Sequence, residues 1–249
     1  MRYLTFIVIA LLSLVSCKDK QTIEEPNIDF GYEYFPLEIG SELIYRVDST
    51  IYDPQENSVE ILTSMTYIRE VVVDTFQDEL GRLSHKVERF ERPNVAVDWE
   101  LKNVWSAVRT ETQAERFEDN LRFIKMVFPV DDGDIWNGVA YLDVTVEYPV
   151  AGDRVAIFKS WDNNTEVIDQ GQPETGGDFA FEEVTTIQLA DEENLLEKRY
   201  GIEKYAKGVG LIFKELQIYN TQDIENETEP WEVKTERGFR VVMTLVDYK

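Results

Sequence analysis

Apolar and polar residues alternate with a period of two along most of this chain. Leu43, Tyr45 and Val47 alternate with neighbours that belong to the other face, and the same period runs through 141–148. The segment 58–76 is long and rich in β-branched residues, and 238–248 closes the chain in the same manner. A period of two is typical of strands that have one buried face. We therefore expect strands at these four places.

Turn-forming residues separate the alternating segments. Clusters of Gly, Pro, Asn and Asp lie at 53–57, 78–81, 91–94, 151–153 and 171–178. Between 191 and 208 the residues fit either a short helix over 191–198 or a hairpin with its turn at 191–194, and we favour the hairpin. Many strands joined by short turns favour an all-β fold, a curved antiparallel sheet of half-barrel or barrel-like form that protects its edges.

Two stretches of the sequence resemble each other. Both "FPLEIGSEL" (35–43) and "FPVDDGDIW" (128–136) read Phe, Pro, aliphatic, acid, any residue, Gly, then two residues before a large apolar one. Proline fits just outside a strand because it cannot donate to the ladder, and glycine permits a positive φ in a turn. We interpret both as one strand-entry device, which predicts that Leu43 and Trp136 are buried at strand starts. The pair also suggests a weak duplication of 34–127 in 128–249.

The N-terminus carries an export signal. Leu4 to Val15 form an apolar run after Arg2, and twelve residues rise about 18 Å, well short of a hydrocarbon core of about 30 Å. Residues 1–16 therefore read as a signal peptide. The ending Leu14, Val15, Ser16, Cys17 resembles the lipobox of bacterial lipoproteins, which implies that Cys17 is lipidated with palmitate-type acyl chains and becomes the first mature residue. The polar residues 17–33 read as a tether, and 34–249 as one domain.

Composition narrows the classes of function. Cys17 is the only cysteine, so a lipidated Cys17 leaves no disulfide, cysteine metal site or thiol nucleophile. The formal net charge of −24 repels nucleic acids and anionic lipid head groups. We expect no nucleic acid partner, and contact with the membrane only through the lipid.

Residues with catalytic or metal-binding potential form no recognisable site. The single histidine, His85, lies in an alternating segment without a nucleophile elbow, and we expect it on a solvated strand face. The acids at 131–134 lack the spacing of an EF-hand calcium loop, so a calcium ion is a minor alternative. Acid pairs such as Glu182 and Glu183 could serve glycoside hydrolysis, and the five tryptophans could stack sugars, but core or rim packing is the usual role of tryptophan in a β domain. We predict no catalytic residue, metal or cofactor, and cannot name a ligand-binding residue.

Two longer phrases resemble a known group of proteins. "YFPLEIGSELIYRVDS" (34–49) is similar to the opening of many uncharacterised Bacteroidota cell-envelope lipoproteins, and "EKYAKGVGLIFKEL" (203–216) to a late phrase in them. Leu43 stands where that group usually has tryptophan. The resemblance implies an envelope address and an all-β fold but no activity. A more distant analogy is with periplasmic lipoprotein carriers, whose curved sheet surrounds acyl chains.

These observations favour a non-enzymatic, lipid-anchored protein of the cell envelope. We expect attachment to the outer membrane, with the face left open, and binding of a hydrophobic ligand or an envelope protein partner through the curved sheet. The alternatives are a glycan-binding or glycan-hydrolysing surface lipoprotein and a structural subunit of an envelope complex. An apolar cavity inside the sheet would separate a carrier from a scaffold.

Overall fold

The computed structural model describes residues 29–162, 165–176, 178–225 and 228–249. Its first half contains η2 (Tyr32–Tyr34), β1 (Glu42–Pro54), β2 (Val59–Gln77), β3 (Leu83–Arg92), β4 (Glu100–Arg109), β5 (Gln113–Glu118), β6 (Leu121–Val127) and β7 (Ile135–Trp136). Its second half contains β8 (Tyr148–Val150), β9 (Asp153–Val155), β10 (Thr165–Gly176), β11 (Phe179–Glu193), β12 (Glu197–Ala206), β13 (Gly210–Asn220), α2 (Trp231–Lys234) and β14 (Arg237–Tyr248).

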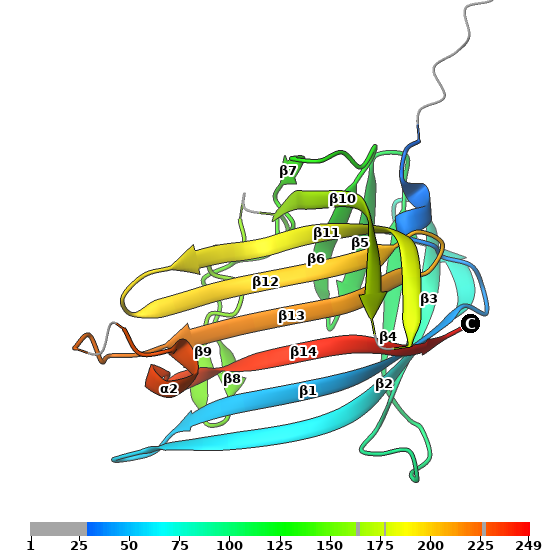
Figure 1. Ribbon diagram of the computed structural model, residues 1–249. Helices are drawn as coiled ribbons and strands as arrows, with labels where there is room; N and C mark the ends of the chain where they lie inside the picture. Colours follow the sequence, from blue (N-terminus) through cyan, green and yellow to red (C-terminus); the bar gives the residue numbers. More distant parts are fainter. Residues whose placement is uncertain (1–28, 163–164, 177, 226–227) are drawn as a thin grey trace, which may run out of the picture.

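Twelve strands of the described chain form one antiparallel sheet that curls into a nearly closed barrel (Figure 1). The strand order is β6-β5-β4-β3-β2-β1-β14-β13-β12-β11-β10-β7, and β8 and β9 pair separately. The two edge strands meet at a seam, where the Ile124 amide donates to the Gly138 carbonyl and the Trp136 indole nitrogen donates to the Ile124 carbonyl, both at 2.9 Å. The expected all-β fold with a curved antiparallel sheet is confirmed.

Three of the four predicted strands are present, and one prediction is wrong. Strands β1, β2 and β14 cover the segments expected from 43, 58 and 238 onward. Residues 141–147 form turns instead of a strand, and only Tyr148–Val150 is extended. The Asp143 side chain accepts hydrogen bonds from the backbone and hydroxyl of Thr145. Such local bonds stabilise a turn and compete with a sheet ladder, so alternation alone is misleading here.

Two further boundaries differ from the sequence-based expectation. The predicted turn at 171–178 is mostly strand, because β10 continues to Gly176. Gly171 and Pro173 lie within β10, where its pairing with β11 shifts register between Asp169 and Glu174. Proline is tolerated there because β7 pairs only with the first two residues of β10. The hairpin near 191 is present, but its turn lies at 194–196 because β11 continues to Glu193.

The two similar stretches enter the sheet in the same way. Gly40 and Gly133 have φ angles of 93° and 82°, which L residues rarely adopt. The Gly40 amide donates to the Val72 carbonyl at 2.7 Å, and the Gly133 amide donates to the Val167 carbonyl at 2.8 Å. The Val72 amide donates to the Ser41 carbonyl and the Val167 amide donates to the Asp134 carbonyl, both at 3.0 Å. The glycine turn before a strand is confirmed in both stretches, but the second leads only into the two-residue β7, and 141–147, where a strand was expected, form turns. The duplication stays a prediction.

The predicted burial of Leu43 and Trp136 is wrong in degree, because both side chains are half-buried. Leu43 is the second residue of β1 and faces an internal cavity rather than solid packing. Trp136 ends the two-residue edge strand β7, where its indole spans the seam to Ile124. The phenylalanines that open the two stretches, Phe35 and Phe128, are buried with 5% and 8% exposure.

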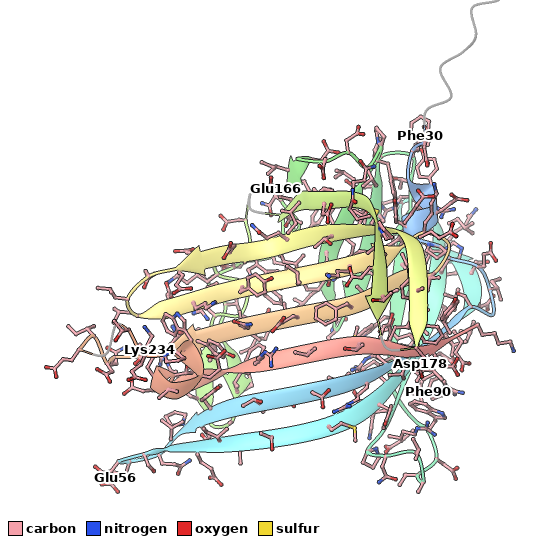
Figure 2. The ribbon with its side chains drawn as sticks, viewed as in Figure 1. Phe30, Glu56, Phe90, Glu166, Asp178 and Lys234 are labelled. Carbon is pink, nitrogen blue, oxygen red and sulfur yellow. The ribbon has the colours of Figure 1, made fainter. Side chains whose placement is uncertain are left out.

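The N-terminal segment closes one end of the barrel. The signal peptide at 1–16, Cys17 and most of the predicted tether lie outside the described residues. From Asp29 onward the chain contacts the domain, since Asp29 lies 2.7 Å from the Lys207 ammonium and Tyr34 is 3% exposed. Figure 2 places Phe30 at the corner of the molecule opposite Glu56, which marks the tip of the β1–β2 hairpin. No helix among the described residues has the length and apolar character needed to cross a membrane.

The long connection between β7 and β10 fills much of the opposite part of the interior. Val155 of β9 packs with Ile218 and Phe239 on β13 and β14. Phe158 contacts Trp161 and Phe123, with ring centroids 5.2 and 5.4 Å apart. The connection and the N-terminal segment therefore leave only part of the barrel interior open.

Candidate functional site: an internal cavity with a charged side

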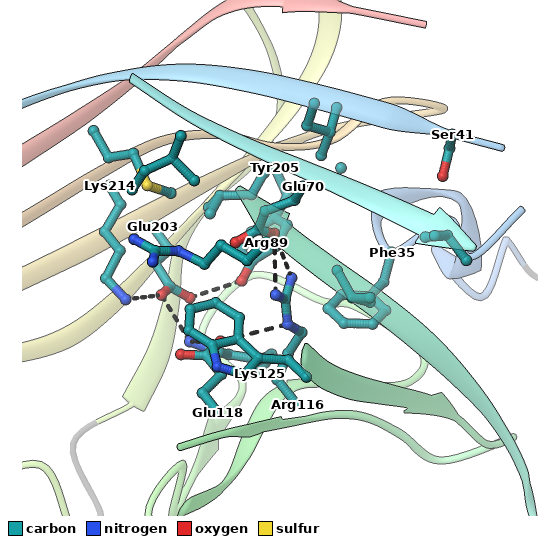
Figure 3. Close-up of a pocket in the computed structure, with 18 of the residues that line it drawn as sticks. Phe35, Ser41, Glu70, Arg89, Arg116, Glu118, Lys125, Glu203, Tyr205 and Lys214 are labelled. Atoms are coloured by element: carbon teal, nitrogen blue, oxygen red, sulfur yellow. Dashed lines mark hydrogen bonds and ion pairs between the residues drawn. The ribbon is translucent and has the colours of Figure 1, made fainter. Parts of the chain in front are cut away.

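A cavity of about 240 Å³ lies inside the barrel (Figure 3). Its apolar wall comes from β1, β2, β13, β14 and the β12–β13 turn region, and includes Leu43, Val47, Ile68, Leu211, Val241 and Met243. Phe35, Pro36 and Leu37, which follow η2, also line it. This volume is slightly below the ~300–1,000 Å³ of typical small-molecule pockets.

Strand register explains why apolar and charged groups meet in this cavity. Across the sheet, Lys214 of β13 is the partner of Met243 on β14, and Met243 is the partner of Val47 on β1. Directly paired residues in a sheet project to the same face. One row of side chains therefore changes from a cation to two apolar groups within three strands. On the other side of Lys214, its partner on β12 is Glu203.

Glu203 is the centre of the charged side of the cavity. Its carboxylate is fully buried, and its Oε1 lies 2.9 Å from both the Lys125 and the Lys214 ammonium nitrogens. The Tyr205 hydroxyl donates to its Oε2 at 2.7 Å. Lys125 belongs to β6, which is far from β12 in the strand order, so this contact crosses the barrel interior. The ion pair thus helps to hold the two halves of the rolled sheet together.

A second set of ion pairs continues from Glu203 toward β2. Both terminal nitrogens of Arg116 donate to one oxygen of Glu70, at 3.0 and 3.1 Å. Glu118 lies between two cations, 3.4 Å from the Arg116 Nε and 3.8 Å from the Lys125 ammonium. Figure 3 shows these groups on one side of the cavity, away from Phe35 and Ser41.

Glu203, Glu118 and Lys214 stay ionised at neutral pH. Burial alone would raise the pKa of Glu203, but the ammonium groups of Lys125 and Lys214 outweigh burial and hold its pKa well below the ordinary value. Burial would likewise lower the pKa of Lys214, and the Glu203 and Glu118 carboxylates raise it instead. The pKa of Glu118 is lowered, since nearby Lys125 and Arg116 outweigh its burial. The cavity therefore carries fixed charges of both signs.

Another buried carboxylate, Glu115, belongs to the opposite face of β5. Arg82 donates to both of its oxygens at 3.0 and 3.1 Å, and Arg122 does so at 2.8 and 3.0 Å. Neighbouring residues of a strand project to opposite faces, so Glu115 and Arg116 belong to separate networks. Because two guanidinium groups cover Glu115 completely, this cluster acts as a structural clamp on the outer surface.

The residues considered from the sequence lie elsewhere. His85 is half-buried on β3, where burial lowers its pKa. Glu182 and Glu183 are consecutive residues of β11 and project to opposite faces, so they cannot face each other across a cleft. The Asp134 carboxylate accepts the Asp131 amide at 3.1 Å, which is a turn contact.

The tryptophans are packing residues rather than an exposed platform. Trp161 and Trp231 are buried, and Trp99, Trp105 and Trp136 are half-buried. The guanidinium of Arg92 lies 4.1 Å from the Trp99 ring centroid, and that of Arg89 lies 5.0 Å from the Trp105 ring. The core role expected for tryptophan is confirmed for Trp161 and Trp231, whereas Trp105 also lines the cavity.

The charged residues of the cavity were not predicted from the sequence. A usable signal was present, because Arg116, Glu118, Lys125, Glu203 and Lys214 all occupy the face of their strand that carries buried apolar residues elsewhere. In the sequence each of these charged residues is indistinguishable from a surface residue, because its ion-pair partners lie on strands distant in sequence.

No known family model matches this chain, and no curated protein matches it. Among solved structures, it is similar to a "putative exported protein with YmcC-like fold" from Bacteroides fragilis NCTC 9343, with 12% identity, a TM-score of 0.39, and coverage of 89% of this chain and 100% of that chain. It is also similar to a "putative lipoprotein" from Parabacteroides distasonis ATCC 8503, with 10% identity, a TM-score of 0.39, and coverage of 90% of this chain and 100% of that chain.

Proposed function

We propose that this protein is a non-enzymatic, lipid-anchored protein of the cell envelope that binds a hydrophobic ligand inside its barrel. The observation that carries the proposal is the apolar wall that β1, β2, β13 and β14 give to the cavity. The cavity is partly open to solvent and holds about 240 Å³, which is room for a short alkyl chain. Burial of an alkyl chain against this wall would be favourable by the hydrophobic effect.

The state of the cavity carboxylates supports a binding role over catalysis. A general acid needs a pKa near the working pH, which enzymes reach by raising the pKa of a carboxylate. Glu203 and Glu118 instead have lowered pKa values, and Glu203 accepts bonds from three donors. These groups therefore act as fixed charges that shape the cavity.

The membrane attachment belongs to this proposal through Cys17. Acylation at that residue would hold the protein at a bilayer, since each buried methylene contributes about 0.8 kcal/mol. Outer-membrane attachment through this anchor is part of the proposal, and the side of the membrane is left open.

Binding of a neutral apolar dye tests the cavity directly. N-phenyl-1-naphthylamine fluoresces on entering an apolar site, and we expect enhanced fluorescence with the purified wild-type protein. Met243→Trp fills the cavity wall and should abolish the enhancement, whereas Met65→Trp makes the same change at a side chain that is 39% exposed and should leave it intact. An unenhanced wild type, or equal enhancement in both variants, would contradict a binding site in this cavity.

A further inference from the structure

We infer that the cavity selects amphiphiles with an anionic oxygen head group, a carboxylate or a phosphate, and that Lys214 holds this head. The inference rests on the proposed function and adds the chemical class of the ligand. It comes from the position of one ammonium group at the border between the charged and the apolar sides of the cavity.

Among the described residues of the two linked ion-pair sets, Lys214 is the cation with the fewest ion-pair contacts. Its described ion-pair partner is Glu203, and the same oxygen of Glu203 also receives Lys125. An ammonium has three donors, so one shared oxygen uses only part of its capacity. Lys214 is also the most exposed of these basic side chains, at 20% against 7% for Lys125 and 14% for Arg116.

The other charges lining the cavity are more completely neutralised. Arg89 has Glu91 and Asn103 as partners, and Arg116 binds Glu70 with two nitrogens. Among the carboxylates that line the cavity, Glu118 is the most exposed, at 20%, and it lies beside Arg116 and Lys125. Lys214 thus has one ion-pair partner, Glu203, which it shares with Lys125, whereas Glu118 has two cations within 4 Å. An incoming anion is therefore favoured beside Lys214 more than an incoming cation is favoured beside Glu118.

The register places the apolar wall immediately beside this ammonium. Met243 is the direct partner of Lys214 in the sheet, and Val47 is the direct partner of Met243. A ligand whose head contacts Lys214 can therefore lay its chain against Met243 and Val47 without leaving the cavity. This arrangement matches one charged head joined to one alkyl chain.

Four eight-carbon probes separate the contribution of the head from that of the chain. Octanoate, octyl phosphate, 1-octanol and octyltrimethylammonium would each compete with N-phenyl-1-naphthylamine for the wild-type protein. A charge-assisted hydrogen bond corresponds to a preference of roughly 10- to 100-fold, so we expect at least one of the two anions to compete at a concentration about tenfold or more below that of the alcohol and the cation.

Three variants test the role of Lys214. Lys214→Met keeps an unbranched chain and removes the charge, and it should abolish the anion preference. It leaves Glu203 paired with Lys125 and Tyr205, so the fold should persist, as circular dichroism would check. Lys214→Arg restores the cation and should restore the preference. Lys204→Met is the matched control, because Lys204 has similar exposure, at 23%, and pairs with Glu174.

The outcomes distinguish this inference from the proposed function. Selection of octanoate alone would indicate a carboxylate ligand, and selection of octyl phosphate alone a phosphate ligand; both support the inference. Equal competition by all four probes would overturn it while leaving the cavity as an apolar site. An anion preference that survives in Lys214→Met would overturn the assignment to Lys214. Failure of the dye and every probe to bind would instead refute the proposed function.

Discussion

Replacement of Glu203 by glutamine tests whether the charged side of the cavity holds the rolled sheet together. The variant keeps the shape of the side chain but leaves the ammonium groups of Lys125 and Lys214, each 2.9 Å from the same oxygen, without their carboxylate. Breaking a buried ion pair from one side costs about 3–5 kcal/mol, because an uncompensated charge stays buried. For a domain of this size, about 2–4 °C per kcal/mol gives a fall in Tm of roughly 6–20 °C.

Equilibrium unfolding in urea, followed by tryptophan fluorescence and circular dichroism, measures this loss. Glu147→Gln is the matched control, since Glu147 lies 3.7 Å from Arg154 with both side chains more than half exposed. Exposed pairs contribute about 0–1 kcal/mol, so the control should change little. The double variant Glu203→Gln/Lys214→Met should recover part of the loss, because it removes one uncompensated ammonium. If Glu203→Gln costs no more than the control, the reasoning about this network is refuted.

Three other predictions concern pH, the seam and the anchor. The pKa values of Glu203 and Glu118 are lowered in the folded state, so their stabilisation is complete above an unfolded pKa of about 4.3 and is lost as pH falls toward the folded values. Urea midpoints should therefore fall on acidification below about pH 4.3, less steeply in Glu203→Gln than in the wild type, and equal slopes would contradict this. Gly138→Ala would bring a Cβ within 2.6 Å of the Thr165 hydroxyl oxygen beside the seam and should lower the free energy of unfolding in urea by about 1–3 kcal/mol. Gly176→Ala is the control, because its Cβ would meet nothing within 4 Å, and it should be nearly neutral. Similar losses in both variants would argue against a tight seam. Cys17→Ala should prevent incorporation of labelled palmitate and release the protein from the membrane fraction of the producing bacterium, and a variant that is still labelled would exclude Cys17 as the acylation site.

Local patterning in the sequence was sufficient where burial on one face dominated. The alternation in β1, β2 and β14 predicted those strands, although burial alternates over only part of each; in β2 it runs through 68–73, whereas 60–65 are exposed on both faces. The same rule failed at 141–147, where the Asp143 carboxylate stabilises a turn. A different rule, that clusters of Gly and Pro mark turns, failed at 171–178, where an almost unpaired edge accommodates Gly171 and Pro173 within β10. Both errors arise because the spacing of apolar residues does not show which side chains bond to the backbone or which strand lies at an edge.

The all-β class, the curved antiparallel sheet and the similar turns at Gly40 and Gly133 could be predicted from the sequence. These features depend on alternation and on glycine conformations, which are local. That the sheet rolls until β6 meets β7, and that Lys125 reaches Glu203 across the interior, follows only from the folded structure. The cavity, with its apolar wall and its charged side, forms only when the sheet closes, because the sequence of one strand does not specify which distant strand will face it. The candidate ligand site is therefore a property of the rolled sheet rather than of any contiguous segment.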